Sequence, residues 1–218
     1  MTRSVFVFLA TLALVVRMMG QTEAASVIRT LGDQDFADGA TVTSGALLAA
    51  SAGEPFPFNG PFIGSDAGGP NFSASWTFTY GLLPFAIQTA SITLGITDHD
   101  SAAAGSQLAS FTVDGNNLTS LLDALFEASQ APSGRYHVYT VAIPASAFPA
   151  LADGSATFSL TLQGPGLGIL GPTQFNGAGL DFSTIILTPI LTPEPAGSIL
   201  LLAGLAGLIG YVRWRWRR

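Results

Sequence analysis

The stretch Ser73–Tyr80, which reads SASWTFTY, alternates large apolar and small polar side chains along its whole length. Trp76, Phe78 and Tyr80 fall on one face, and the serine and threonine residues between them fall on the other. Successive side chains of a β-strand point to opposite faces of the sheet, so the pattern predicts a strand with one buried side. A sheet built from such strands needs an apolar layer packed against that side.

The same alternation recurs before and after this stretch, with turn-forming spacers between the repeats. The expected strands are Ser26–Leu31, Ala90–Thr97, Ala109–Val113, Tyr136–Ile143, Ala156–Gln163 and Gly179–Leu187. Polar spacers rich in glycine and proline separate them at residues 53–71, 98–106 and 164–174. Short half-buried strands with turn signals between them are typical of an antiparallel β-sandwich or jelly roll. The sequence therefore predicts an all-β domain over residues 25–190.

One segment departs from the two-residue period. Thr119–Gln130 (TSLLDALFEASQ) has apolar residues at helical spacing, and Asn117 or Thr119 can cap its start. We expect one short helix here, packed over an edge of the sheet, and a helical turn at Ala145–Leu151.

The composition excludes several classes of site. The 218 residues contain no cysteine, and all 8 basic residues are arginines. Disulfides, thiolate metal sites and cysteine nucleophiles are therefore ruled out. Residues 25–192 hold 12 carboxylates and two arginines, which gives this part a net charge of −10. Such a surface is unsuited to nucleic acid, which selects basic faces, and it repels acidic polymers unless cations intervene.

Residues 1–24 predict a secretory signal peptide. Arg3 precedes the 12 uncharged residues Val5–Val16, and small residues follow at Ala24 and Ala25. Twelve residues are too few to cross a bilayer, which takes about 20, whereas a basic start, a short apolar run and a small-residue exit mark a signal peptide. We expect signal peptidase to cut near Ala24. A short membrane anchor is the alternative.

Residues 191–218 contain three ordered elements at the other end of the chain. Residues 193–195 read Pro-Glu-Pro, and residues 196–212 form an uncharged run of 17 residues. As a helix this run is about 25 Å long, just enough to span a membrane with help from interfacial tryptophans. The positive-inside tendency would keep the arginine-rich tail (213–218) cytoplasmic and the domain outside. The flanking arginines are Arg213, Arg215, Arg217 and Arg218.

This order of elements resembles the PEP-CTERM sorting signal over about 27 residues. The resemblance implies that an exosortase, a membrane transpeptidase of Gram-negative bacteria that make extracellular polysaccharide, recognises Pro193, Glu194 and Pro195. It implies cleavage near this triplet, followed by release of the domain or its attachment at the cell surface. Thr192 departs from the commoner valine before the triplet, and a plain tail anchor is the alternative.

Two internal stretches, Ile96–Leu122 and Gly177–Ile186, resemble the sandwich domains of other exported PEP-CTERM proteins. This resemblance implies an extracellular β domain of unassigned activity.

Four aspartates suggest a calcium site. Asp33, Asp35 and Asp38 lie in a loop after the first expected strand, and Asp181 lies near the start of the last. First and last strands are often neighbours in jelly rolls, so these side chains could converge, and Ca²⁺ takes six to eight oxygen ligands. Aspartates before glycine are also common turn residues, which is the alternative. Asp98–Ser101 is expected to form a turn in which His99 is solvated.

Three phenylalanines are candidates for glycan binding. Phe56, Phe58 and Phe62 lie in a loop bounded by polar residues, where a cluster of apolar rings can mark a binding surface. The alternative is that they close one end of the sandwich.

No motif for catalysis is found. His99 and His137 are the only histidines, and neither a G-x-S-x-G nor an H-E-x-x-H motif occurs. We therefore expect a protein that is not an enzyme.

Together these features predict an exported protein that passes through an inner-membrane intermediate to the cell surface, outer membrane or extracellular matrix. Its expected role is structural, adhesive or glycan-binding in an exopolysaccharide or biofilm setting, with signal peptidase, exosortase and exopolysaccharide as partners. A secreted glycan-active enzyme and a plain tail-anchored periplasmic protein are the alternatives.

Overall fold

The computed structural model describes residues 25–168 and 170–190, together with residues 204–205, 207–208, 212–213 and 215–216 near the C-terminus. Ala25–Pro189 forms one compact unit with eleven antiparallel strands and three short α-helices. The predicted signal peptide and the Pro-Glu-Pro triplet lie outside the described residues. Among the residues that are described, no helix has the length and apolar character needed to cross a membrane.

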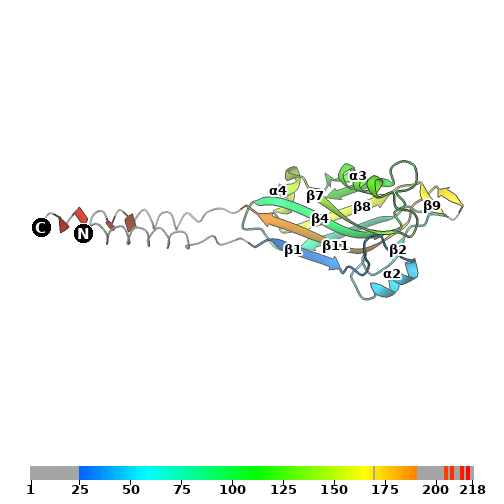
Figure 1. Cartoon of the computed structure of the whole chain (residues 1–218), viewed down its shortest axis with the longest axis horizontal. Helices are drawn as coiled ribbons and strands as arrows, with labels where there is room; N and C mark the ends of the chain where they lie inside the picture. Colours follow the sequence, from blue (N-terminus) through cyan, green and yellow to red (C-terminus); the bar gives the residue numbers. More distant parts are fainter. Residues whose placement is uncertain are drawn as a thin grey trace. The chain divides into compact units, whose positions relative to one another are not determined.

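The first sheet has the strand order β1–β11–β4–β7, and every pairing in it is antiparallel. Figure 1 shows these strands side by side. The two-residue strand β2 (Phe62–Ile63) pairs with the start of β11. The four long strands are β1 (Val27–Gly32), β11 (Ala178–Pro189), β4 (Ile87–Thr97) and β7 (Tyr136–Ile143).

The second sheet has the strand order β3–β8–β5–β6 and is also antiparallel. The spacer at 164–174, expected to be a loop, instead contains a hairpin, because β9 (Gly166–Gly168) pairs with β10 (Gly171–Thr173). The strands of the second sheet are β3 (Ser73–Thr79), β8 (Ser155–Leu162), β5 (Leu108–Val113) and β6 (Asn116–Asn117).

Both sheets contribute alternate side chains to one core, as the two-residue period predicts. Phe158 of β8 lies at its centre, with the rings of Trp76, Phe78 and Phe111 each 5.9 Å away between centroids. Ile92 and Leu94 of β4 supply the opposite layer and are fully buried. This shared core confirms the all-β class and is consistent with a β-sandwich.

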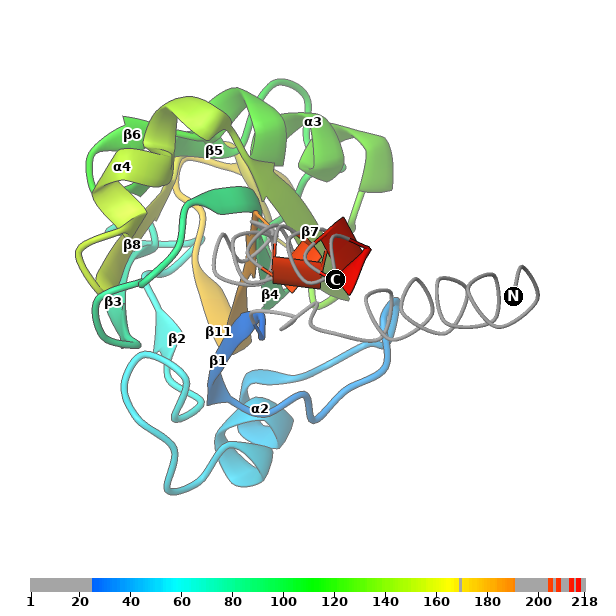
Figure 2. The same cartoon turned by 90° about the vertical axis from the view of Figure 1, so that its left-hand side faces the viewer.

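Three α-helices of the Ala25–Pro189 unit lie beside the sheets, whereas the sequence predicts one helix and one helical turn (Figure 2). The expected helix is α3 (Thr119–Ser129), which buries Leu122 and Phe126 and contacts β5 and β7, so it covers one open side between the sheets. The expected turn comprises a 3₁₀ turn (Ala145–Ala147) followed by α4 (Phe148–Leu151). No period in the sequence predicts α2 (Ser44–Ala50), which consists mostly of small side chains and buries only Leu47.

The strand register places both ends of this domain at the same end of the first sheet. Val27 of β1 pairs with Leu187 of β11, only two residues before β11 ends at Pro189. The loops after β1, β2 and β4 and before β7 and β11 lie at the opposite end, and we call them the distal loops. Because β11 has 12 residues, about 35–40 Å separates the two ends.

Candidate metal centre

The loop after β1 folds back against β11 at Gly32. This glycine has a φ of +71°, and a Cβ on it would lie 2.4 Å from the carbonyl oxygen of Asp181. Only glycine suits both the left-handed backbone and this close approach. The chain therefore brings Asp33 and Asp35 to the distal end of β11.

Asp33, Asp35 and Glu54 form a group that we call the β1-loop cluster. One carboxylate oxygen of each lies within 4.8 Å of the others. The Asp33 backbone N–H donates to Glu54 Oε1 at 3.0 Å, and Ser51 Oγ donates to Asp35 Oδ2 at 3.3 Å. Glu54 Oε2 is buried and has no hydrogen-bond partner among the described residues. Oxygen ligands of this kind suit a hard cation such as Ca²⁺.

Asp181 of β11 holds the loop of this cluster through a hydrogen bond. It lies between the paired residues Leu180 and Phe182, where the register of β11 against β4 shifts. Its Oδ2 accepts hydrogen bonds from the Tyr136 hydroxyl at 2.7 Å and from the Asp35 N–H at 3.2 Å. The side chain is fully buried, and Gly95 of β4 leaves room for the Tyr136 hydroxyl.

The electrostatics of this region favour protonated carboxyl groups when no cation is bound. Burial, the Asp33 side chain and the charges of Asp33 and Asp35 raise the pKa of Glu54 to about 7, although the hydrogen bond from the Asp33 backbone N–H opposes the shift. Burial also raises the pKa of Asp181 to about 6, although its hydrogen bond from Tyr136 opposes the shift. A bound cation would replace these protons by favouring the ionised forms.

The structure brings together three of the four aspartates predicted for calcium, and Asp38 lies apart from them. Asp38 Oδ1 contacts His137 Nδ1 at 3.1 Å and accepts from the Val138 N–H at 3.0 Å. Asp38 therefore fastens the loop after β1 to β7. Glu54 lies beside Asp33 and Asp35 instead, and no local pattern predicts it because it stands in a loop without periodicity.

The expectation of a solvated His99 is wrong. His99 is fully buried, its Nε2 lies 2.8 Å from the Tyr139 hydroxyl, and its ring packs 4.2 Å from that of Phe126. Burial and the nearby His137 lower its pKa to about 3, so it stays neutral. The helix α3 covers this position, which local turn signals could not reveal.

The three candidate phenylalanines have different environments. Phe58 is fully buried and contacts Trp76 at 5.6 Å between ring centroids, so it belongs to the core. Phe62 is half-buried in β2. Phe56 is 65% exposed, in the same distal region as Glu54, and is the one ring of the three that is open to a ligand.

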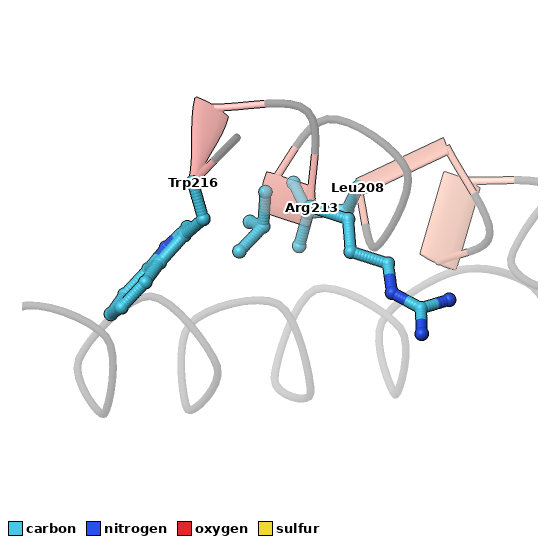
Figure 3. Close-up of a pocket in the computed structure, with 4 residues that line it drawn as sticks. Leu208, Arg213 and Trp216 are labelled. Atoms are coloured by element: carbon cyan, nitrogen blue, oxygen red, sulfur yellow. The ribbon is translucent and has the colours of Figure 1, made fainter. Parts of the chain in front are cut away.

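The C-terminal segment is described only in part. Arg213, Arg215 and Trp216 are exposed, whereas Arg217 and Arg218 lie outside the described residues. Leu208, Val212, Arg213 and Trp216 line a hollow in this segment (Figure 3). None of these residues belongs to the Ala25–Pro189 domain, so the hollow has no part in the acidic site.

Neither a protein-family model nor a curated protein matches this chain. Among solved structures, the dimeric latent PorU of Porphyromonas gingivalis is similar over 81% of this chain, with a TM-score of 0.38 and 11% sequence identity. The match spans 14% of the PorU chain. A similarity of this size carries no argument about function.

Proposed function

We propose that this chain is an exported protein of a Gram-negative cell surface or extracellular matrix, sorted by an exosortase through Pro193, Glu194 and Pro195. The order of elements in the sequence supports this: a signal peptide, a compact domain, then the triplet, an apolar run and arginines. The domain ends at Pro189, four residues before the triplet. Pro193 and Pro195 disfavour a helix at this position in the sequence, which favours access by a processing enzyme.

The position of the domain's ends is the observation that carries the proposed role of the domain. Because Val27 and Pro189 lie at one end of the first sheet, attachment through the C-terminus leaves the distal loops pointing away from the attachment point. These loops carry the β1-loop cluster and the exposed ring of Phe56. The proposed role is adhesion to, or reinforcement of, an exopolysaccharide matrix through this end.

The sorting step is tested by the intact mass of the mature protein from a Gram-negative host that has an exosortase. The expected mass begins near Ala25 and ends near Pro195, and Glu194→Ala keeps the protein in the membrane at its unprocessed length. Glu127→Ala, which removes an exposed carboxylate on α3, is the matched control and is processed normally. A wild-type mass that retains residues 196–218 would contradict the sorting proposal.

Glycan binding is tested by co-sedimentation with the exopolysaccharide of the same host. Phe56→Ala is expected to reduce the bound fraction, because a sugar ring would lose the exposed aromatic face. Leu82→Ala is the matched control, since Leu82 is 80% exposed but follows β3 at the opposite end of the domain. Equal binding by both variants would remove Phe56 from the contact surface.

A further inference from the structure

A second group of carboxylates lies in the distal loops, apart from the four aspartates singled out by the sequence. Asp66 follows β2, and Asp98 and Asp100 follow β4. One carboxylate oxygen of each lies within 4.8 Å of the others, and we call this group the β4-loop cluster. Ca²⁺–oxygen distances of about 2.3–2.6 Å allow two ligands on opposite sides of one ion to be this far apart.

Hydrogen-bond donors from two other loops and from the β9–β10 hairpin hold these carboxylates in place. Asp66 Oδ1 accepts from the Gly177 N–H at 2.7 Å, and Asp98 Oδ1 accepts from Ser133 Oγ at 2.9 Å and from the Gly134 N–H. Asp100 Oδ2 accepts from the N–H of Leu167 in the β9–β10 hairpin. The cluster therefore joins the loops before β7 and β11 and the hairpin to the loops after β2 and β4.

The most informative member is Asp100, which is fully buried. Its Oδ1 is enclosed and has no hydrogen-bond partner among the described residues. A buried carboxylate oxygen without a donor is costly unless a cation or a proton satisfies it. Asp98 and Asp100 also have left-handed φ values of +63° and +56°, which are uncommon for residues with a Cβ.

A second unsatisfied oxygen lies beside the cluster, on Asn176. This residue is fully buried, its Nδ2 donates to the carbonyl of His99 at 3.0 Å, and its Oδ1 has no partner in the described part of the chain. His99 stands between Asp98 and Asp100, and Asn176 precedes the glycine that donates to Asp66. Asp100 and Asn176, which belong to loops that meet at the cluster, therefore each have an enclosed oxygen without a donor among the described residues.

Among the described residues, no basic side chain is seen to pair with these carboxylates. The basic side chains nearest in the fold have other partners: His137 Nδ1 contacts Asp38 Oδ1 at 3.1 Å, and Arg135 donates to the carbonyl of Gly39. Burial and the repulsion from Asp98 and Asp66 raise the pKa of Asp100 to about 8, and burial raises that of Asp66. Buried carboxyl groups that lie close together repel one another when ionised, so their pKa values rise unless a cation is bound.

We propose that the β4-loop cluster binds one Ca²⁺ ion through carboxylate oxygens of Asp66, Asp98 and Asp100. The donors are all oxygens, which favours a hard cation over zinc, and flexible coordination with water in the remaining positions is usual for Ca²⁺. The ion cross-links the distal loops and the β9–β10 hairpin. Its role is to hold the outward end of the domain rigid, as disulfides do in domains that have cysteine.

The test compares thermal unfolding of the full chain, purified in detergent, in EDTA and in CaCl₂. At free Ca²⁺ about 100-fold above its dissociation constant, the expected rise in Tm is about 5–10 °C for a domain of this size. Calorimetric titration should give one ion per chain at this site. An equal Tm in EDTA and CaCl₂, with no binding heat, would overturn the proposal.

Conservative variants separate this site from its neighbours. Asp100→Asn keeps an acceptor for the Leu167 N–H and removes a carboxyl group whose raised pKa makes it costly to bury at neutral pH. It should therefore raise the Tm in EDTA and abolish the Ca²⁺-dependent rise. Asp66→Asn, at a less buried position, should weaken Ca²⁺ binding at least tenfold. This variant replaces Asp100→Asn in the test if Asp100→Asn fails to fold. A full Ca²⁺ response in either variant would overturn the proposal.

Two matched controls locate the ion. Asp153→Asn changes an exposed aspartate whose Oδ1 also accepts from a backbone N–H, at 2.9 Å from Ser155, and it should keep the full response. Asp33→Asn tests the β1-loop cluster, the other group of oxygen ligands, and the response persists in this variant if the ion binds at the β4-loop cluster. If Asp33→Asn abolishes it and Asp100→Asn does not, the ion binds at the other cluster and the proposal is wrong.

Discussion

The contact between Gly95 and Tyr136 gives the sharpest test of how the β1-loop cluster is held. A Cβ at position 95 would lie 2.2 Å from the Tyr136 hydroxyl oxygen and 2.8 Å from the ring of Phe182. In Gly95→Ala, the hydroxyl must therefore move by about 1 Å to reach ordinary contact. That movement lengthens or breaks its 2.7 Å hydrogen bond to Asp181.

The cost follows from these contacts. Overpacking a filled site costs about 1–3 kcal/mol, and losing a buried hydrogen bond to a charged group costs about 1.5–3 kcal/mol. Replacing glycine with alanine inside a strand otherwise stabilises the fold by about 0.5–1 kcal/mol. We expect Gly95→Ala to lower the free energy of unfolding by about 2–5 kcal/mol. Tyr136→Phe alone should cost about 1.5–3 kcal/mol, because Asp181 loses one of its two donors.

A double-mutant cycle measured by urea unfolding and circular dichroism tests the reasoning. In the Gly95→Ala background, Tyr136→Phe removes the clashing hydroxyl, so its cost should fall by at least 1 kcal/mol relative to the wild-type background. Gly45→Ala, at an open position in α2, is the control and should be neutral or stabilising. Additive effects within about 0.5 kcal/mol would show that the two positions do not compete for the same space.

Three further changes test other parts of the structure. Phe158→Ala should cost about 3–5 kcal/mol in urea unfolding, because it empties the centre of the aromatic core, whereas Phe56→Ala should leave stability within about 0.5 kcal/mol. The folded-state pKa of Glu54 lies above its ordinary value, so its contribution to stability is present below about pH 4.5 and is lost as pH rises through about 7. In EDTA, Glu54→Gln should therefore be more stable than the wild type at pH 8 and lose this advantage at pH 5. A difference in free energy of unfolding that stays constant between these pH values would contradict the raised pKa. The N-cap residue of α3 is Leu118 and not the predicted Asn117 or Thr119, but Asn117 Oδ1 accepts from the first N–H of the helix at 2.8 Å. Asn117→Ala should therefore cost about 1 kcal/mol, and an unchanged unfolding curve would show that this hydrogen bond does not stabilise the helix.

Local patterns predict the strands well, because the side of a strand that faces the core is set by the alternation of neighbouring residues. Tyr136–Ile143 forms β7 with the predicted bounds, and Ser73–Thr79 alternates exposed and buried residues throughout. The helix α3 follows equally from its spacing. By contrast, α2 and the β9–β10 hairpin were missed, since their short glycine-containing sequences have no clear period.

The acidic sites depend on contacts between residues far apart in the sequence. Asp35 reaches Asp181 because β1 pairs with β11, and Asp66 reaches Asp100 because β2 and β4 both pair with the start of β11. His99 is buried because α3 packs over it.

The sequence alone determined the two-residue period, the expected export and sorting segments and the absence of cysteine. Only the tertiary structure decided which carboxylates meet and which histidine is buried. The physical reason is that periodicity sets the direction of each side chain, whereas strand pairing and register set its partners.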